Sequence, residues 1–176
     1  SEVMIYLDSG ATSFRKPPQV YRAVLEAMQT CANPGRGGYA AARRAGDVIY
    51  GCREAAGELF DCLPEQVVLT NNCTHGLNLA IRSCIRPGDT VVISGFEHNA
   101  VTRPLHALGA RVRIAGRKLF DREDTLTAFR QALEEADAAV FTHVSNVFGY
   151  ILPVEEMAAA CRDAGIPFVV DAAQSA

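Results

Sequence analysis

From Pro64 onward, short apolar runs alternate with longer amphipathic stretches, and this alternation limits the folds open to the chain. The apolar runs lie at 67–70, 90–93, 110–114, 138–142 and 167–170. Runs of this length between turn residues are typical of buried strands, and strands that alternate with helices form parallel sheets. We therefore expect an α/β fold with a doubly wound, mainly parallel sheet and helices on both faces.

The first part of the chain has a different pattern. Residues 5–12 begin as a predicted short strand and continue into a loop of small residues. Residues 19–30 have the apolar spacing of an amphipathic helix, and a second, longer helix is predicted from about 39 to 60. We expect residues 1–38 to form an N-terminal arm and helix, and residues 39–176 to belong to a larger domain.

Composition and charge exclude several function classes. The chain has 176 residues, of which 49% are hydrophobic and 21% are charged, as in a soluble globular domain. Its net charge of −3 does not favour nucleic acid or an anionic membrane as a partner. No apolar run approaches the roughly 20 residues of a membrane span, and the first residues lack the basic start of a signal peptide. We expect a cytoplasmic protein.

The cysteines show no disulfide or metal-site pattern, and lysines are few. None of the six cysteines belongs to a Cys-x-x-Cys pair, and the four histidines are not at metal-ligand spacing with them. We therefore expect free structural thiols and no metal site. Lysine is scarce, because only Lys16 and Lys118 among the 17 basic residues are lysines.

The last apolar run ends in an acidic residue. Residues 167–170 show no alternation of apolar and polar side chains, which predicts a central strand covered on both faces. Asp171 follows directly, at the carboxyl end of the strand, where open α/β sheets bind ligands, and Gln174 comes three residues later. A buried carboxylate needs a positive or hydrogen-bonding partner, so Asp171 is either a ligand-binding acid or a helix N-cap or ion-pair residue.

Three other loops carry polar side chains to the same edge of the predicted sheet. Residues 71–76 lead directly into a helix, whose free N–H groups would suit a phosphate with the Thr74 hydroxyl as a further donor; a simple helix cap is the alternative. The next loops contain His98, which could equally be an ordinary surface or core histidine, and Asn146. Together with Asp171, the set suits a flat, phosphorylated ring with a nitrogen, because an acid that keeps this nitrogen protonated makes the ring an electron sink.

Six motifs give the chain a resemblance to a known family. They are IYLDSGAT at 5–12, NPGRGG at 33–38, NCTH at 72–75, EHNAV at 97–101, HVSNVFG at 143–149 and VDAAQSA at 170–176. In this order and spacing, the chain resembles the class V aminotransferase group of pyridoxal 5′-phosphate (PLP) enzymes, most closely the cysteine desulfurases and selenocysteine lyases. The resemblance implies the large domain of a fold type I PLP-dependent transferase.

The resemblance also implies which residues bind the cofactor. They are Cys73, Thr74, His75, His98, Asn146, Asp171 and Gln174. Thr74 and the neighbouring backbone amides would bind the phosphate, and His98 would stack on the ring and assist proton transfer. Asn146 and Gln174 would lie on the side of the ring hydroxyl, with Asn146 also near the substrate carboxylate. Asp171 would pair with the pyridine nitrogen.

Two departures from the family pattern matter. The family usually has glutamate where His75 stands and commonly alanine where Cys73 stands, so the detail of the phosphate loop is left open. The Schiff-base lysine, the nucleophilic cysteine and the small domain of the family would follow residue 176, so we expect the chain to be a truncated, N-terminal portion of such an enzyme. Ala11 and its neighbours would line the substrate side.

By resemblance, the expected reaction removes sulfur or selenium from cysteine or selenocysteine and leaves alanine. The substrate would be a cysteine-like amino acid, and the expected partners are a second copy of the chain and a protein that accepts the sulfur. Another class V aminotransferase or lyase reaction is one alternative. A non-catalytic fragment that acts as a binding or assembly module is the other, and activity of the 176 residues alone is left open.

Overall fold

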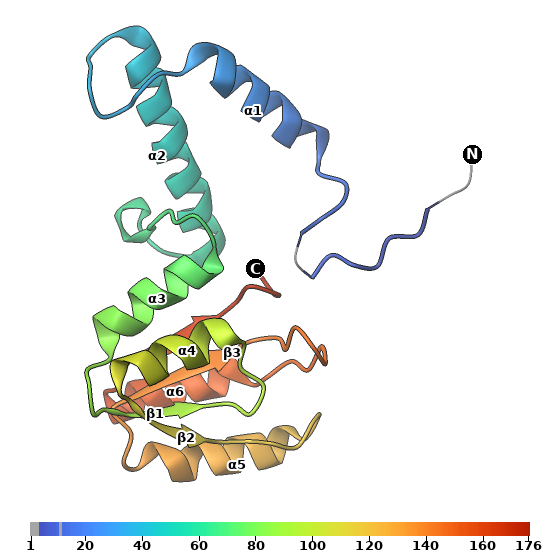
Figure 1. The fold of residues 1–176 in the computed structure, drawn as a ribbon, viewed down its shortest axis with the longest axis vertical. Coiled ribbons are helices and arrows are strands. Elements are labelled where there is room, and N and C mark those ends of the chain that lie inside the picture. Colours follow the sequence, from blue (N-terminus) through green and yellow to red (C-terminus); the bar gives the residue numbers. More distant parts are fainter. Residues whose placement is uncertain (1–3, 11) are drawn as a thin grey trace. The chain divides into compact units, whose positions relative to one another are not determined.

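The structure is a computed structural model that describes residues 4–10 and 12–176 (Figure 1). Contacts within the chain divide it into two compact units, residues 1–69 and residues 70–176. Each unit is described by itself below. The domain division after residue 38 that the sequence suggests stays a prediction. None of the helices in the described ranges combines the length and the apolarity that a membrane crossing requires.

The first unit is helical in its described part. Helix α1 (Pro18–Thr30) begins with a proline, which suits the first helical turn because its missing N–H has no partner there. Helix α2 (Ala40–Phe60) ends at Asp61, whose backbone is left-handed, and a 3-10 turn, η1 (Pro64–Gln66), follows. Both long helices match the helices predicted from the apolar spacing.

Two predicted strands are wrong. Residues 5–10 and 67–70 are irregular, while residue 11, the Ala11 of the proposed substrate side, lies outside the described residues. A strand requires a hydrogen-bonded neighbour, and none of the strand pairings in the described chain includes either segment. Val68 is 72% exposed. The apolar side chains of this run are therefore not evidence of a buried strand.

The second unit contains a parallel sheet of four strands. The strands are β1 (Thr90–Ile93), β2 (Arg111–Ile114), β3 (Ala138–Thr142) and β4 (Phe168–Asp171). Their order across the sheet is β2-β1-β3-β4, and every pairing is parallel. All four carboxyl ends therefore lie at one edge, and Thr142 at the end of β3 pairs with Asp171 at the end of β4.

Two helices cover each face of this sheet (Figure 1). They are α3 (Cys73–Cys84) and α4 (Asn99–Leu108) on one face, and α5 (Arg122–Leu133) and α6 (Val154–Ala164) on the other. Val91 of β1 packs in the first cluster with Ile81 and Leu105, whereas its neighbour Val92 packs in the second with Phe129. The prediction of a doubly wound α/β sheet with helices on both faces is confirmed.

Among the described strands β4 lies at the edge of the sheet, so this part of the chain does not show the predicted central strand covered on both faces. Among the described strands it pairs with β3 alone, and Val170 is 38% exposed. An apolar sequence shows that a strand has a buried side, but it does not show how many neighbours the strand has. The fully buried central strands are β1 and β3.

Gly116 keeps the loop after β2 close to α5, with a backbone angle φ of +77°. A Cβ at this position would lie 2.9 Å from Thr125 Oγ1, whereas a Cβ at Gly109, where φ is +75°, would meet nothing within 4 Å. We expect Gly116→Ala to lower the free energy of unfolding by about 1–3 kcal/mol more than Gly109→Ala, because only the first adds overpacking to left-handed strain. Urea unfolding of both variants measures the difference, and equal losses would contradict it.

Candidate functional site

Asp171 is a buried carboxylate at the carboxyl edge of the sheet. Its side chain is placed by β4 and is only 5% exposed. Its Oδ1 accepts a hydrogen bond from the Ala173 N–H at 3.0 Å and one from the Cys73 thiol at 3.5 Å. Asp171 caps none of the helices α3 to α6 and belongs to none of the ion pairs found in the described chain. The ion-pair interpretation of this acid is therefore wrong. Its bond to the Ala173 N–H precedes a turn in which the Ala172 carbonyl accepts the Ala176 N–H, so it has the geometry of a cap.

The loop at 71–76 leads directly into α3, as the sequence predicts. Asn72 is the N-cap of the helix, since its Oδ1 accepts the His75 N–H at 2.8 Å. Thr74 is therefore not the cap, and it is the second residue of α3, in the turn whose first N–H groups have no partner within the helix. These groups and the positive end of the helix dipole suit an anion such as phosphate.

His98 is fixed at the start of α4. Its Nδ1 accepts the Ala100 N–H at 3.0 Å and so caps the helix. A neutral imidazole whose Nδ1 accepts must carry its proton on Nε2, which leaves Nε2 as a donor. The expectation that an isolated histidine has a structural role is thus correct for one ring nitrogen, and the other is available for chemistry.

Thr74 and His98 line one groove between α3 and α4, with a volume of about 340 Å³. The lining also includes Arg82 and Arg103, and it contains no acidic side chain. Neither arginine takes part in the ion pairs found in the described residues. The groove therefore has an uncompensated positive charge, with Arg82 in the last turn of α3 and Thr74 in the first.

The remaining predicted residues lie on loops at the same edge. Asn146 follows β3 and Gln174 follows β4, and both are exposed. The two loops are tied together, because His143 Nδ1 and Ser175 Oγ are 3.0 Å apart in a hydrogen bond. His75 contributes its backbone N–H to the cap of α3, and its side chain is exposed. The contacts predicted for Asn146, Gln174 and His75 with a cofactor stay predictions.

Glu97 is a residue of this edge that the sequence analysis missed. Its Oε1 accepts hydrogen bonds from the Thr142 N–H at 2.9 Å and from the Ser94 hydroxyl. Its Oε2 is buried and has no hydrogen-bond partner in the described chain. Burial, with a smaller effect from the charge of Asp171, raises the pKa of Glu97 to about 7, although the hydrogen bonds from Ser94 and Thr142 act to lower it. Glu97 thereby anchors the loop of His98 to the end of β3.

The sequence does contain a signal for Glu97, because it is an acid directly before His98 in a strand-end loop. Its burial could not be predicted, since it depends on the position of β3, which comes 45 residues later at Thr142.

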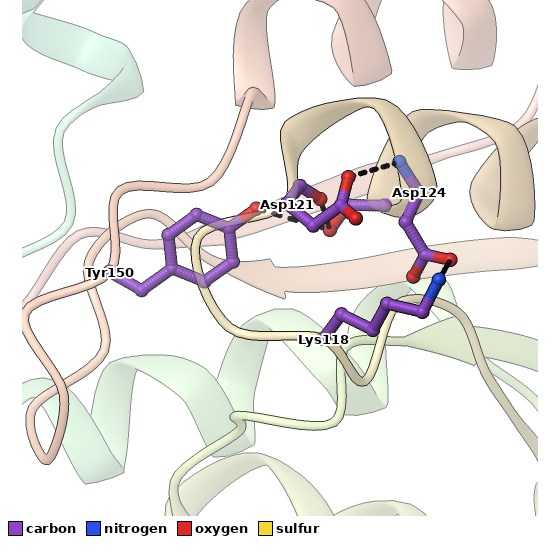
Figure 2. Close-up of polar contacts among 5 residues, drawn as sticks. Lys118, Asp121, Asp124 and Tyr150 are labelled. Carbon is purple, nitrogen blue, oxygen red and sulfur yellow. Dashed lines mark hydrogen bonds and ion pairs between the residues drawn. The ribbon is translucent and has the colours of Figure 1, made fainter.

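Neither lysine is a free amine in the structure. Figure 2 shows Lys118 beside Asp124 at the start of α5, with Nζ and Oδ1 2.9 Å apart, and Asp121 accepting the Asp124 N–H. The hydrogen bond from Lys118 to Asp124, with the charges of Asp124 and Asp121, raises the pKa of Lys118, which keeps the amine protonated. Lys16 donates to the Ser13 carbonyl at 2.9 Å.

The donor and acceptor groups at this edge fit a phosphorylated ring with a protonated nitrogen. The first turn of α3 supplies positive potential for the phosphate, and the buried carboxylate of Asp171 supplies a partner for a positive ring atom. All six cysteines are free thiols. The described residues include no group of three His, Cys, Asp or Glu side chains placed to hold a metal ion.

Comparisons with known proteins agree with this fold. A family model described as aminotransferase class-V matches residues 5–176. A probable cysteine desulfurase from Synechocystis sp. is 30% identical over 190 residues, which cover 98% of this chain and 43% of the relative. The apo structure of a cysteine desulfurase from Thermococcus onnurineus NA1 matches with a TM-score of 0.85 and 29% identity, over 97% of this chain and 44% of that one.

A variant of the cystine C–S lyase C-DES, with glycine covalently linked to its PLP cofactor, shares the fold. Its TM-score is 0.75 at 21% identity, over 91% of this chain and 44% of that one. The chain thus spans less than half the length of the relatives it matches.

The pKa of Glu97 predicts a specific dependence of stability on pH. Since burial raises this pKa from 4.5 to about 7, the folded chain keeps a proton that the unfolded chain has released between these values. The resulting stabilisation is complete below pH 4.5 and is lost as the pH rises through about 7, by at most about 1.4 kcal/mol per pH unit.

We expect the free energy of unfolding to fall less steeply between about pH 5 and pH 8 in Glu97→Gln than in the wild type. Urea titrations at several pH values measure this slope. The exposed Glu134→Gln is the matched control and should keep the wild-type slope. A Glu97→Gln slope equal to that of the wild type would show that Glu97 is not the titrating group.

Proposed function

The chain belongs to the class V aminotransferase family, and on that premise we propose that it is the cofactor-binding part of a PLP-dependent cysteine desulfurase or selenocysteine lyase. Such an enzyme removes sulfur or selenium from cysteine or selenocysteine and leaves alanine. The observation that carries the proposal is the buried Asp171 carboxylate, which faces no cation in the described chain and lies beside the first residue of α3. The cysteine desulfurase relative at 30% identity supports this reaction among those of the family.

The proposal assigns a role to each residue at the edge of the sheet. PLP, when bound, supplies an electron sink for the reaction. Asp171 would keep a proton on the ring nitrogen, because a buried carboxylate stabilises a nearby positive charge with little screening. Thr74 and the first two N–H groups of α3, from Cys73 and Thr74, would bind the phosphate, with the His75 N–H beside them engaged by Asn72. His98 would stack on the ring and exchange a proton at Nε2, since Nδ1 is engaged by Ala100.

Asn146 and Gln174 complete the proposed site on the side of the ring hydroxyl. The hydrogen bond between His143 and Ser175 supports this assignment, because it joins the loop of Asn146 to the segment that contains Gln174. We also assign Asn146 to the neighbourhood of the substrate carboxylate.

The assembly of the whole enzyme is proposed from the family resemblance. We propose a homodimer that passes the released sulfur to an acceptor protein. Sedimentation velocity over a concentration series should show association of the chain. Material that stays monomeric at every concentration would speak against the dimer.

Pyridoxamine 5′-phosphate is the probe for the proposed site, because it has no aldehyde that could react with Lys16 or Lys118. We expect Asp171→Asn to weaken its binding at least about tenfold, since a hydrogen bond to a charged group is worth about 1.5–3 kcal/mol. Thr74→Ala should weaken binding about fivefold, because it removes one of several neutral phosphate contacts. Isothermal titration calorimetry measures both dissociation constants.

Ser83→Ala is the control for these variants. Ser83 is exposed near the far end of α3, where its hydroxyl donates to the Leu79 carbonyl at 2.7 Å. This variant should bind as the wild type does. Absence of binding in the wild type would overturn the proposed function, whereas equal losses in Asp171→Asn and Thr74→Ala would overturn the leading role of Asp171.

A further inference from the structure

Cys73 and Asp171 touch each other although 98 positions separate them in the sequence. Cys73 is the first residue of α3, and Asp171 is the last residue of β4. The Cys73 Sγ lies 3.5 Å from Asp171 Oδ1, and the same oxygen accepts the Ala173 N–H at 3.0 Å. One oxygen of the carboxylate is therefore held by two donors from different segments of the chain.

The thiol of Cys73 is in the state that can donate. A position at a helix N-terminus tends to lower the pKa of a cysteine, but here other effects are larger. Cys73 is exposed as a residue, but partial burial of its thiol, then the charge of Asp171 and the hydrogen bond to it, raise the pKa of Cys73 above its usual value of 9.0. At neutral pH the sulfur therefore keeps its proton, and the S–H group points its weak donor at a carboxylate.

We propose that Cys73 is a positioning residue for Asp171, and that its thiol holds Oδ1 so that Oδ2 is left to pair with a positively charged ring nitrogen. The structure itself shows the contact between the side chains of Cys73 and Asp171. Only the last step, the pairing of Oδ2 with a ring nitrogen, rests on the proposed function.

The thiol of Cys73 can restrict the rotation of the Asp171 carboxylate. A carboxylate held at one oxygen by the Ala173 N–H can still turn about its terminal torsion, because such sp³–sp² torsions are broad. A second donor to the same oxygen, from the other side of the edge, restricts that rotation. The charge of Asp171 also acts on Glu97, whose Oε1 is already engaged by Ser94 and Thr142.

The first experiment tests the contact without any cofactor. The rate of alkylation of Cys73 by iodoacetamide at about pH 8 is followed by mass spectrometry, and Cys84, exposed at the other end of α3, is the internal control. Asp171→Asn removes the negative charge and keeps the shape. We expect it to speed alkylation of Cys73 about threefold to tenfold, because the thiolate fraction rises while the nucleophilicity falls in part. The rate at Cys84 should not change.

An unchanged rate at Cys73 in Asp171→Asn would overturn the proposal. If this variant does not fold, the wild-type chain provides the test by itself. The pH profile of alkylation of Cys73 should then show a higher apparent pKa in the folded chain than in the urea-unfolded chain. Equal profiles in the two states would overturn the proposal in the same way.

The second experiment tests the consequence for the ring nitrogen. Cys73→Ala should weaken the binding of pyridoxamine 5′-phosphate about twofold to fivefold, since one weak hydrogen bond to Asp171 is lost. Cys73→Ser retains a donor and should restore binding to near the wild-type value. A pyridoxamine phosphate analogue with carbon in place of the ring nitrogen should bind Cys73→Ala and the wild type equally, because it has no partner for Oδ2.

The two experiments separate failure of this inference from failure of the proposed function. If alkylation responds to Asp171 but the wild type binds no pyridoxamine 5′-phosphate, the contact is correct and the cofactor assignment is wrong. If the wild type binds the probe and Cys73→Ala binds equally well, the cofactor site is correct and the positioning role of Cys73 is wrong. The same holds if Cys73→Ser fails to restore the affinity.

Discussion

A parallel sheet must be covered on both faces, and this requirement organises the second unit of the chain. Strands β1 and β3 are fully buried, so their side chains are apolar on both sides, and helices pack against each face. Because each strand returns through a helix, all four strands point the same way. The loops that carry polar side chains are therefore gathered at one edge by topology, before any of them interacts with another.

Burial also decides what the acids at this edge can do. Asp171 and Glu97 both lie among backbone donors at the ends of strands, but their partners differ. Asp171 receives two donors on Oδ1, whereas Glu97 has a buried Oε2 without a partner and a pKa near 7. Asp171 Oδ1 is thus held by two donors, whereas Glu97 is partly protonated at neutral pH because burial raises its pKa.

The parts of the structure that depend on local sequence could be predicted, and those that depend on distant contacts could not. Strands at 90–93 and 138–142 match their apolar runs because the turn residues around them are local signals. The run at 67–70 is equally apolar and forms no strand, since strand formation needs a neighbour that the sequence does not reveal. In the site, Thr74, His98 and Asp171 could be placed at one edge from topology. The thiol donor from Cys73 and the burial of Glu97 could not, because both arise from contacts between distant segments.

The strand order β2-β1-β3-β4 has a consequence for synthesis on the ribosome. Strand β1 pairs with β2 as soon as Ile114 has emerged, but its other edge must wait for β3, which begins at Ala138. The intervening segment, 115–137, takes about 1 to 5 seconds to translate at typical rates. During this interval one edge of a strand that is fully buried in the finished fold is unpaired, which makes the nascent chain at this stage a natural substrate for chaperones that shield exposed strand edges.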